Sequence, residues 1–152
     1  MADIERRVKL CMAANERYLT ALSVVDRVVK TSEVLDRVSV PVMKDHQRSR
    51  GLRPVSPEDG VLLQAVMDAR HLINGITNAS LQRILYGESA SDLSESRRRS
   101  SRVSRQLRML RRHGLIRKLG TRRLYRVTPK GQQTMGLALA IRQSTNILAR
   151  AA

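Results

Sequence analysis

Apolar side chains recur every three or four residues along most of this chain, which is the pattern of amphipathic helices. Over the first thirty residues they form a seam in alternating steps of four and three from Ile4 to Val29, interrupted by the polar Asn15. Neighbouring apolar residues such as Leu10 and Val24 widen this seam. We therefore expect a helix that packs either on its own chain or against a second copy of it.

A shorter helix is predicted over residues 31–38, TSEVLDRV, and the pattern then changes. Residues 39–59 combine several prolines, a β-branched start and a polar middle, which predict a connector that can include a short hairpin. We place a domain boundary within this connector. It divides the chain into an N-terminal helical segment with its connector, residues 1–50, and a second domain, residues 51–152.

The second domain opens with a strong helix start. Ser56 can cap this helix, Pro57 suits its first position, and Glu58 and Asp59 lie where the helix dipole favours negative charge. One face of the helix is apolar and carries Leu62, Ala65, Val66 and Ala69. After Asn74–Gly75, residues 76–87 predict a second helix with Thr77 or Asn78 as its cap, Gly87 as its terminator, and a buried face made of Leu81, Ile84 and Leu85.

A longer helix is predicted over residues 94–113, with Gly114 at the stop position. At about 100° per residue, Val103, Leu107 and Leu110 fall on one face, and four arginines fall on the opposite side, Arg98, Arg105, Arg108 and Arg112. Residues 115–127, LIRKLGTRRLYRV, alternate around Gly120–Thr121 and predict a hairpin with Tyr125 and Val127 turned inward. A last helix is predicted after the Thr128 cap, with an apolar stripe at Leu137, Ile141 and Leu148.

Charge is distributed unevenly along the chain. Residues 1–95 hold 13 Lys or Arg and 13 Asp or Glu, whereas residues 96–152 hold 16 Lys or Arg and no acid, so the last part carries the whole net charge of +16. Such an asymmetry suits a polyanionic partner, most often nucleic acid and less often an anionic membrane surface. Apolar residues recur at helix and then strand spacing through this basic part, which favours a folded surface over a disordered tail.

The sequence lacks the residue patterns that several kinds of chemistry require. His46, His71, His113 and Cys11 show no metal-binding spacing, no GxxxxGK[ST] loop occurs, and no carboxylate follows Glu95. We therefore expect no enzymatic activity, no cofactor and no metal. The charged start MADIERRVKL does not resemble a signal peptide, and GLALAI, residues 136–141, falls far short of the ~20 apolar residues that span a bilayer. We expect a cytoplasmic protein that does not enter the membrane.

From residue 57 onward the predicted order is helix, short extended piece, helix, basic helix, two-stranded hairpin and long helix. With the segment LRMLRRHGLIRKLGTRRLYRVTPKG, residues 107–131, this order resembles the winged helix-turn-helix family of DNA-binding domains over about residues 57–148. The resemblance implies a mainly α fold with a small β-hairpin wing, preceded by an N-terminal helical segment. Residues 17–140 also resemble the C-terminal part of longer, uncharacterised bacterial proteins found near mobile elements.

The family resemblance implies that the helix of residues 94–113 enters the major groove and that the wing, residues 115–127, follows the backbone or the minor groove. Arginine can form paired hydrogen bonds with guanine, and arginine and lysine also bind phosphates. For base contact we predict Arg98, Ser101, Arg102 and Arg105. For phosphate or wing contact we predict Arg97, Ser104, Arg108, Arg112, Arg117, Lys118, Arg122 and Arg123.

Together with the resemblances, these residues predict a double-stranded DNA-binding protein, a sequence-specific transcriptional regulator associated with the bacterial nucleoid. A homodimer through residues 1–30 and 129–148 would place two basic helices about 34 Å apart on DNA. The alternative is a structural subunit that holds RNA or DNA by shape and phosphate within a larger nucleoprotein or mobile-element complex. Comparing the affinities for selected duplex, random duplex and structured RNA separates the two.

Overall fold

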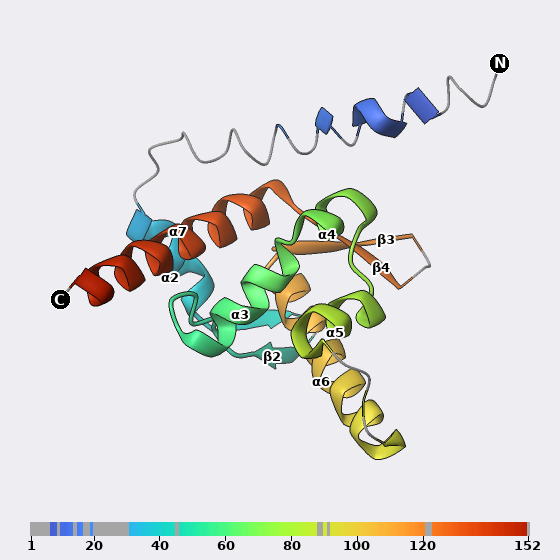
Figure 1. Cartoon of the computed structure of the whole chain (residues 1–152). Coiled ribbons are helices and arrows are strands. Elements are labelled where there is room, and N and C mark those ends of the chain that lie inside the picture. The colour runs from blue at the N-terminus through green and yellow to red at the C-terminus, as the bar shows by residue number, and fades with distance from the viewer. Residues whose placement is uncertain are drawn as a thin grey trace.

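The computed structural model describes residues 7, 8, 10–13, 15, 16, 19, 31–44, 46–87, 90, 92–120 and 123–151. Its elements follow in the order α2 (Thr31–Ser39), β1 (Val42–Lys44), β2 (Gln47–Ser49), α3 (Pro57–Val66), α4 (Ala69–Asn74), α5 (Asn78–Tyr86), α6 (Leu93–Arg112), β3 (Ile116–Leu119), β4 (Leu124–Val127) and α7 (Pro129–Ala151) (Figure 1). The predicted mainly helical fold with a small hairpin after the basic helix is therefore confirmed. The hairpin predicted within the connector is also present, as β1 and β2.

The predicted N-terminal helix falls mostly outside the described residues. Those of its positions that the structure describes are helical, and they include the exposed side chains of Val8, Leu10, Met12 and Leu19. Whether this segment packs on its own chain or on a second copy stays a prediction.

The predicted helix after Ser56 divides into two in the structure. Ser56 caps α3 as predicted, because its Oγ accepts a hydrogen bond from the Asp59 N–H at 3.3 Å. The helix ends at Val66, and a carboxylate oxygen of Asp68 accepts a hydrogen bond from the Arg70 N–H at 2.9 Å to start α4. An aspartate carboxylate accepts hydrogen bonds from the unpaired N–H groups in the first turn of a helix, so Asp68 favours a new helix N-terminus at this position. Ala69, which was predicted to share the apolar face of a single helix with Leu62, is exposed.

The next two helices follow their predicted caps closely. Thr77 and Ser80 form a capping box at the start of α5, and Gly87 ends that helix with a positive φ of 68°. Asp92, just before the predicted start of the basic helix, accepts a hydrogen bond from the Glu95 N–H at 2.6 Å and begins α6. Gly114 lies directly after the C-cap of α6 with a φ of 73°, a conformation that glycine adopts at little cost.

The β3–β4 hairpin is joined to the body of the protein by a short bridge. Ile76 and Tyr125 exchange two main-chain hydrogen bonds, of 2.7 and 2.8 Å, between the segment before α5 and strand β4. Gly75 allows this approach, since a Cβ at that position would lie 2.9 Å from the Leu124 side chain. Tyr125 and Val127 pack against the core, as predicted.

Helix α7 closes the fold by packing on α2 and α3. Thr128 caps it, because Oγ1 accepts a hydrogen bond from the Gly131 N–H at 3.0 Å. The buried residues of α7 are Gly131, Thr134, Met135 and Ala138, whereas the predicted stripe residues Leu137 and Ile141 are half-buried. The side chain of Leu148 lies outside the described part of the chain. The deepest contact of α7 with the core is therefore made by residues beside this stripe, including the fully buried Met135.

A single core joins the helices, and it is filled by aliphatic residues and methionine. The predicted anchors of the basic helix, Val103, Leu107 and Leu110, are all buried in it. Val38 of α2 and Leu52 belong to the same core, and the Leu52 N–H donates to the Val38 carbonyl at 2.9 Å. Helix α2 and the β1–β2 hairpin thus pack against elements of the predicted second domain.

Candidate nucleic-acid interface

Helix α6 carries a buried face and a basic exposed face, as its periodicity predicted. While Val103, Leu107 and Leu110 are buried, the opposite side of the helix is exposed at Arg98 and Arg105. The other exposed basic residues of α6 are Arg97, Arg102, Arg108 and Arg111. Figure 1 shows the first turns of α6 projecting away from the other helices, which leaves this end of the helix accessible.

The three successive arginines Arg97–Arg99 have different surroundings. Arg99 donates a hydrogen bond through Nε to Glu95 Oε1 at 2.8 Å, and its Cζ lies 4.8 Å from the centre of the Tyr86 ring. Such a cation over an aromatic ring is stabilising, so Arg99 holds the start of α6 to the end of α5. Arg97 and Arg98 remain exposed at the surface.

On one side of the basic face, α6 meets α5 and the wing. The Asn78 side-chain amide donates hydrogen bonds to the Ser100 carbonyl at 2.9 Å and to Ser104 Oγ at 2.8 Å. Ser104, predicted to contact phosphate, is therefore bound to the first turn of α5. These residues border a hollow of about 300 Å³ whose rim includes Arg123 of the wing. The wing also exposes Arg117 and Lys118 on β3, while Arg122 lies outside the described residues.

On the other side of the basic face lies a larger hollow of about 740 Å³, between α6, α3 and the β1–β2 hairpin. Arg102 and Arg105 line it together with Arg50, Met109 and Ser49. The residues of α6 that line the two hollows differ. The exposed side of the helix that carries Arg98 and Arg105, here called the basic ridge, therefore runs between the hollows. Of the predicted base-contact residues, Arg98 and Ser101 are exposed, and Arg102 and Arg105 combine exposure with a position at the larger hollow.

Arg112 is engaged within the protein. It was predicted to contact phosphate, but Nη1 donates to Ser49 Oγ at 2.9 Å and Nη2 donates to Gln47 Oε1. Both partners belong to strand β2, which lies far from Arg112 in the sequence. The guanidinium therefore joins the end of α6 to the β1–β2 hairpin, and helical periodicity offered no signal for this contact.

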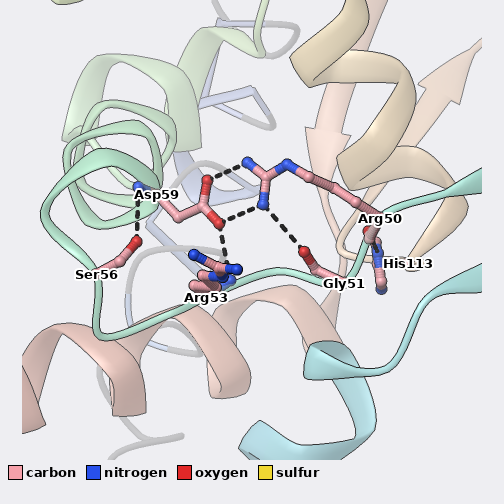
Figure 2. A network of polar contacts seen from close by, with 6 residues as sticks. All are labelled: Arg50, Gly51, Arg53, Ser56, Asp59 and His113. Atoms are coloured by element: carbon pink, nitrogen blue, oxygen red, sulfur yellow. Dashed lines mark hydrogen bonds and ion pairs between the residues drawn. The ribbon is translucent and has the colours of Figure 1, made fainter.

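A polar network fixes the connector between β2 and α3 (Figure 2). The Asp59 carboxylate accepts hydrogen bonds from Arg50 at 2.8 and 2.5 Å and from the Arg53 N–H at 2.8 Å. Burial alone would raise the pKa of Asp59, but these hydrogen bonds outweigh it and lower the pKa below its usual value. His113 is bonded through Nε2 to the Arg50 carbonyl at 2.9 Å, so the network reaches the end of α6.

Two histidines have clear structural positions. His113 is buried in the network just described, and His71 is buried with Nδ1 2.8 Å from the Ala65 carbonyl and Nε2 2.9 Å from Ser80 Oγ. Among the described residues, no group of three or more His, Cys, Asp or Glu side chains is arranged to hold a metal ion. None of the helices in that part of the chain is long and apolar enough to cross a membrane.

Two exposed cations near the predicted interface were not among the predicted contact residues. Arg111 lies beside the apolar face in helical projection, and Lys44 belongs to a hairpin that carried no recognisable motif. The local charge of the connector was the available signal for Lys44. Comparison with protein-family models, with curated proteins and with solved structures found no match to this chain.

Proposed function

We propose that this chain is a double-stranded DNA-binding protein of the winged helix-turn-helix type, and that it acts as a sequence-specific transcriptional regulator. The observation that carries the proposal is the exposed basic ridge of α6, which is anchored by a buried face and followed by a basic hairpin. An α-helix fits the major groove of B-form DNA, and guanidinium groups can bind both guanine edges and phosphates there.

The spacing of arginines along α6 supports a role in base contact for its N-terminal and central turns. Arg98 and Arg105 are seven residues apart, so they lie nearly in line and about 10 Å from each other along the helix. A helix that lies in the major groove turns one side toward the base edges, so both side chains can face base edges at once. Ser101 lies on the same side between them and offers a hydroxyl that can donate or accept.

The elements beside α6 support phosphate contact on one flank. Arg117 and Lys118 lie on strand β3, and Arg123 lies near the start of β4 at the hollow between the wing and α6. In the proposed complex these cations and Arg108 contact the backbone while residues 98–105 of α6 lie in the groove. Counterion release would then make the affinity steeply dependent on salt.

Selection of bound sequences from a random duplex pool tests the proposal. At physiological salt we expect a selected duplex to bind ~1,000-fold or more tightly than random duplex. A ratio near one, or tighter binding of structured RNA, would instead support a nucleoprotein subunit that holds its partner by shape and phosphate. Failure of the protein to bind any of the three would refute nucleic-acid binding altogether.

Two matched variants separate base contact from phosphate contact. Arg105→Ala should cost about 1–3 kcal/mol on the selected duplex and relax the preference at one base position. Arg123→Ala should weaken selected and random duplex alike and reduce the salt slope by about 1. Equal effects of the two variants on both duplexes would show that the roles are wrongly assigned.

A homodimer is part of the proposal. Two copies joined through residues 1–30 and 129–148 would bind half-sites about 34 Å apart, so the selected sites should be palindromic. Sedimentation of the protein on such a duplex should give two chains per site. Full-affinity binding of one chain to an isolated half-site would contradict the dimer without affecting the proposal for α6.

A further inference from the structure

The β1–β2 hairpin lies against the end of α6. Arg112 binds Gln47 and Ser49 of strand β2, and His113 binds the carbonyl of Arg50, the residue that follows the strand. Ser49 is buried, and strand β1 also contacts α6. Two successive residues, Arg112 and His113, therefore hold the hairpin against the last turn of the basic helix.

Strand register determines which hairpin residues share the side toward α6. Val42 pairs with Ser49 and Lys44 pairs with Gln47, whereas Met43 pairs with Arg48. Alternate residues of a strand point to the same side of the sheet, so Lys44 shares the side of Gln47 and Ser49. Since those two residues contact Arg112, this is the side toward α6, and Arg48 lies on the other side.

Lys44 extends the basic ridge of α6. Arg98, Arg105 and Arg112 recur every seven residues and lie nearly in line, spaced about 10 Å apart along the helix. At the end of this line the guanidinium of Arg112 is occupied by Gln47 and Ser49, and the next cation on that side of the hairpin is the exposed Lys44. The tip residue Asp45 lies outside the described part of the chain.

The position of the hairpin at the end of α6 indicates what Lys44 would meet. If residues 98–105 of α6 lie in the ~12 Å wide major groove, the last turn of α6 and the hairpin packed on it lie toward the groove edge, where the sugar-phosphate backbone runs. A lysine at that point suits a phosphate, because its ammonium is a compact charge on a flexible stem.

We propose that the β1–β2 hairpin is a second phosphate-binding arm, in which Lys44 contacts the DNA backbone on the flank of α6 away from the β3–β4 wing. The inference rests on the proposed function, since it requires α6 to lie in the major groove. In this arrangement α6 is held between two hairpins, and Arg112 positions the second of them.

The test uses two variants that remove the same charge from opposite sides of one hairpin, Lys44→Gln and Arg48→Gln. Each is titrated with the selected duplex and with random duplex across a range of salt, beside the wild type, Arg123→Gln in the wing and Arg37→Gln on α2. Arg37 is exposed and lies on a helix that packs on α7, so this variant reports the general effect of losing one positive charge. Thermal unfolding of each variant confirms that it is folded.

Loss of one phosphate contact should reduce the salt slope by about 0.9. The ratio of the wild-type DNA affinity to that of Lys44→Gln should thus fall about 3.5-fold between roughly 50 and 200 mM salt, equally on both duplexes. Arg48→Gln and Arg37→Gln should leave the slope unchanged. If Lys44→Gln keeps the wild-type slope, or matches Arg48→Gln, the inference is overturned.

The outcomes separate the inference from the proposed function. If the wild type binds duplex and Arg123→Gln flattens its slope while Lys44→Gln does not, only the second arm is refuted. If the wild type binds no duplex, the proposed function fails and the inference fails with it.

A double-mutant cycle tests the positioning role of Arg112. If Arg112 acts by holding the hairpin, Lys44→Gln should have little further effect on DNA affinity in an Arg112→Gln background. If the two effects add, Arg112 acts on DNA independently of the hairpin, and its assignment as a positioning residue is wrong.

Discussion

Replacement of Asp59 by Asn should destabilise the protein markedly, because the Asp59 carboxylate fastens the connector that leads from the β1–β2 hairpin into α3. The Asp59 side chain is only 5% exposed, and three hydrogen bonds reach it from Arg50 and from the Arg53 N–H. Asparagine keeps one acceptor oxygen but turns an NH₂ group toward donors, so at least one charge-assisted hydrogen bond is lost and a buried donor is left unpaired.

The expected loss in the free energy of unfolding depends on how exposed the Asp59 and Arg50 side chains are. A hydrogen bond to a charged group contributes about 1.5–3 kcal/mol, and a broken buried ion pair can cost more when the remaining charge stays buried. The Arg50 side chain is 55% exposed and can return to water, which limits the extra cost. We expect a loss of about 2–3 kcal/mol in the free energy of unfolding, or about 5–10 °C in Tm for a chain of this size.

Urea unfolding followed by circular dichroism measures this loss, and Asp68→Asn is the matched control. Asp68 caps α4 and pairs with Arg70, but their side chains are 26% and 69% exposed. Asparagine preserves the cap, so we expect Asp68→Asn to cost less than about 1 kcal/mol. Equal losses for the two variants would refute the reasoning from burial.

The pH dependence gives a second check. Because the pKa of Asp59 is lower in the folded protein than in the unfolded chain, its ionised form stabilises the fold above the unfolded pKa of about 4, and this contribution is lost as the pH falls through the folded pKa. The difference in stability between wild type and Asp59→Asn should be constant above about pH 5 and shrink below about pH 4. A difference that does not change with pH would mean that the charge of Asp59 is irrelevant.

Further predictions concern the packing of the helices. Gly131→Ala should destabilise the fold by more than about 2 kcal/mol, whereas Gly136→Ala should stabilise it by about 0.5–1 kcal/mol. A Cβ at position 131 would lie 2.0 Å from the main-chain oxygen of Leu115, while one at position 136 would meet no atom within 4 Å, so chemical denaturation of the two variants should give opposite signs. Leu81→Ala should cost about 2–5 kcal/mol because it leaves a cavity in the core, and Leu93→Ala should cost almost nothing. Leu81 is 0% exposed and Leu93 is 79% exposed, so similar midpoints in urea for these two variants would contradict the assigned core.

Helix starts were predictable from the sequence because capping is a local interaction. Ser56, Thr77 and Thr128 each bind an N–H within three residues, so the sequence contains both partners side by side. The break before α4 was missed even though Asp68 is also a capping residue. The periodic apolar residues on both sides of it predicted one continuous helix, and their signal outweighed that of a single aspartate.

The candidate interface was predictable in outline for a similar reason. A regular helix places Val103 and Leu107 on one side and Arg98 and Arg105 on the other whatever surrounds it, so the apolar pattern alone indicated which side would be buried. The pattern cannot say whether an arginine on the exposed side meets solvent or another part of the chain. Arg99 and Arg112 both found partners within the protein.

By itself, the sequence determined the helical pattern, the hairpin after Gly114 and the concentration of positive charge in the last third of the chain. Only the tertiary structure decided which of those charges remain available and which other segments join them. The partner of Arg112 lies 63 residues away in strand β2, and the hairpin that carries Lys44 reaches α6 through that contact. Such contacts depend on how the helices pack around a shared core, and no local pattern of residues specifies that packing.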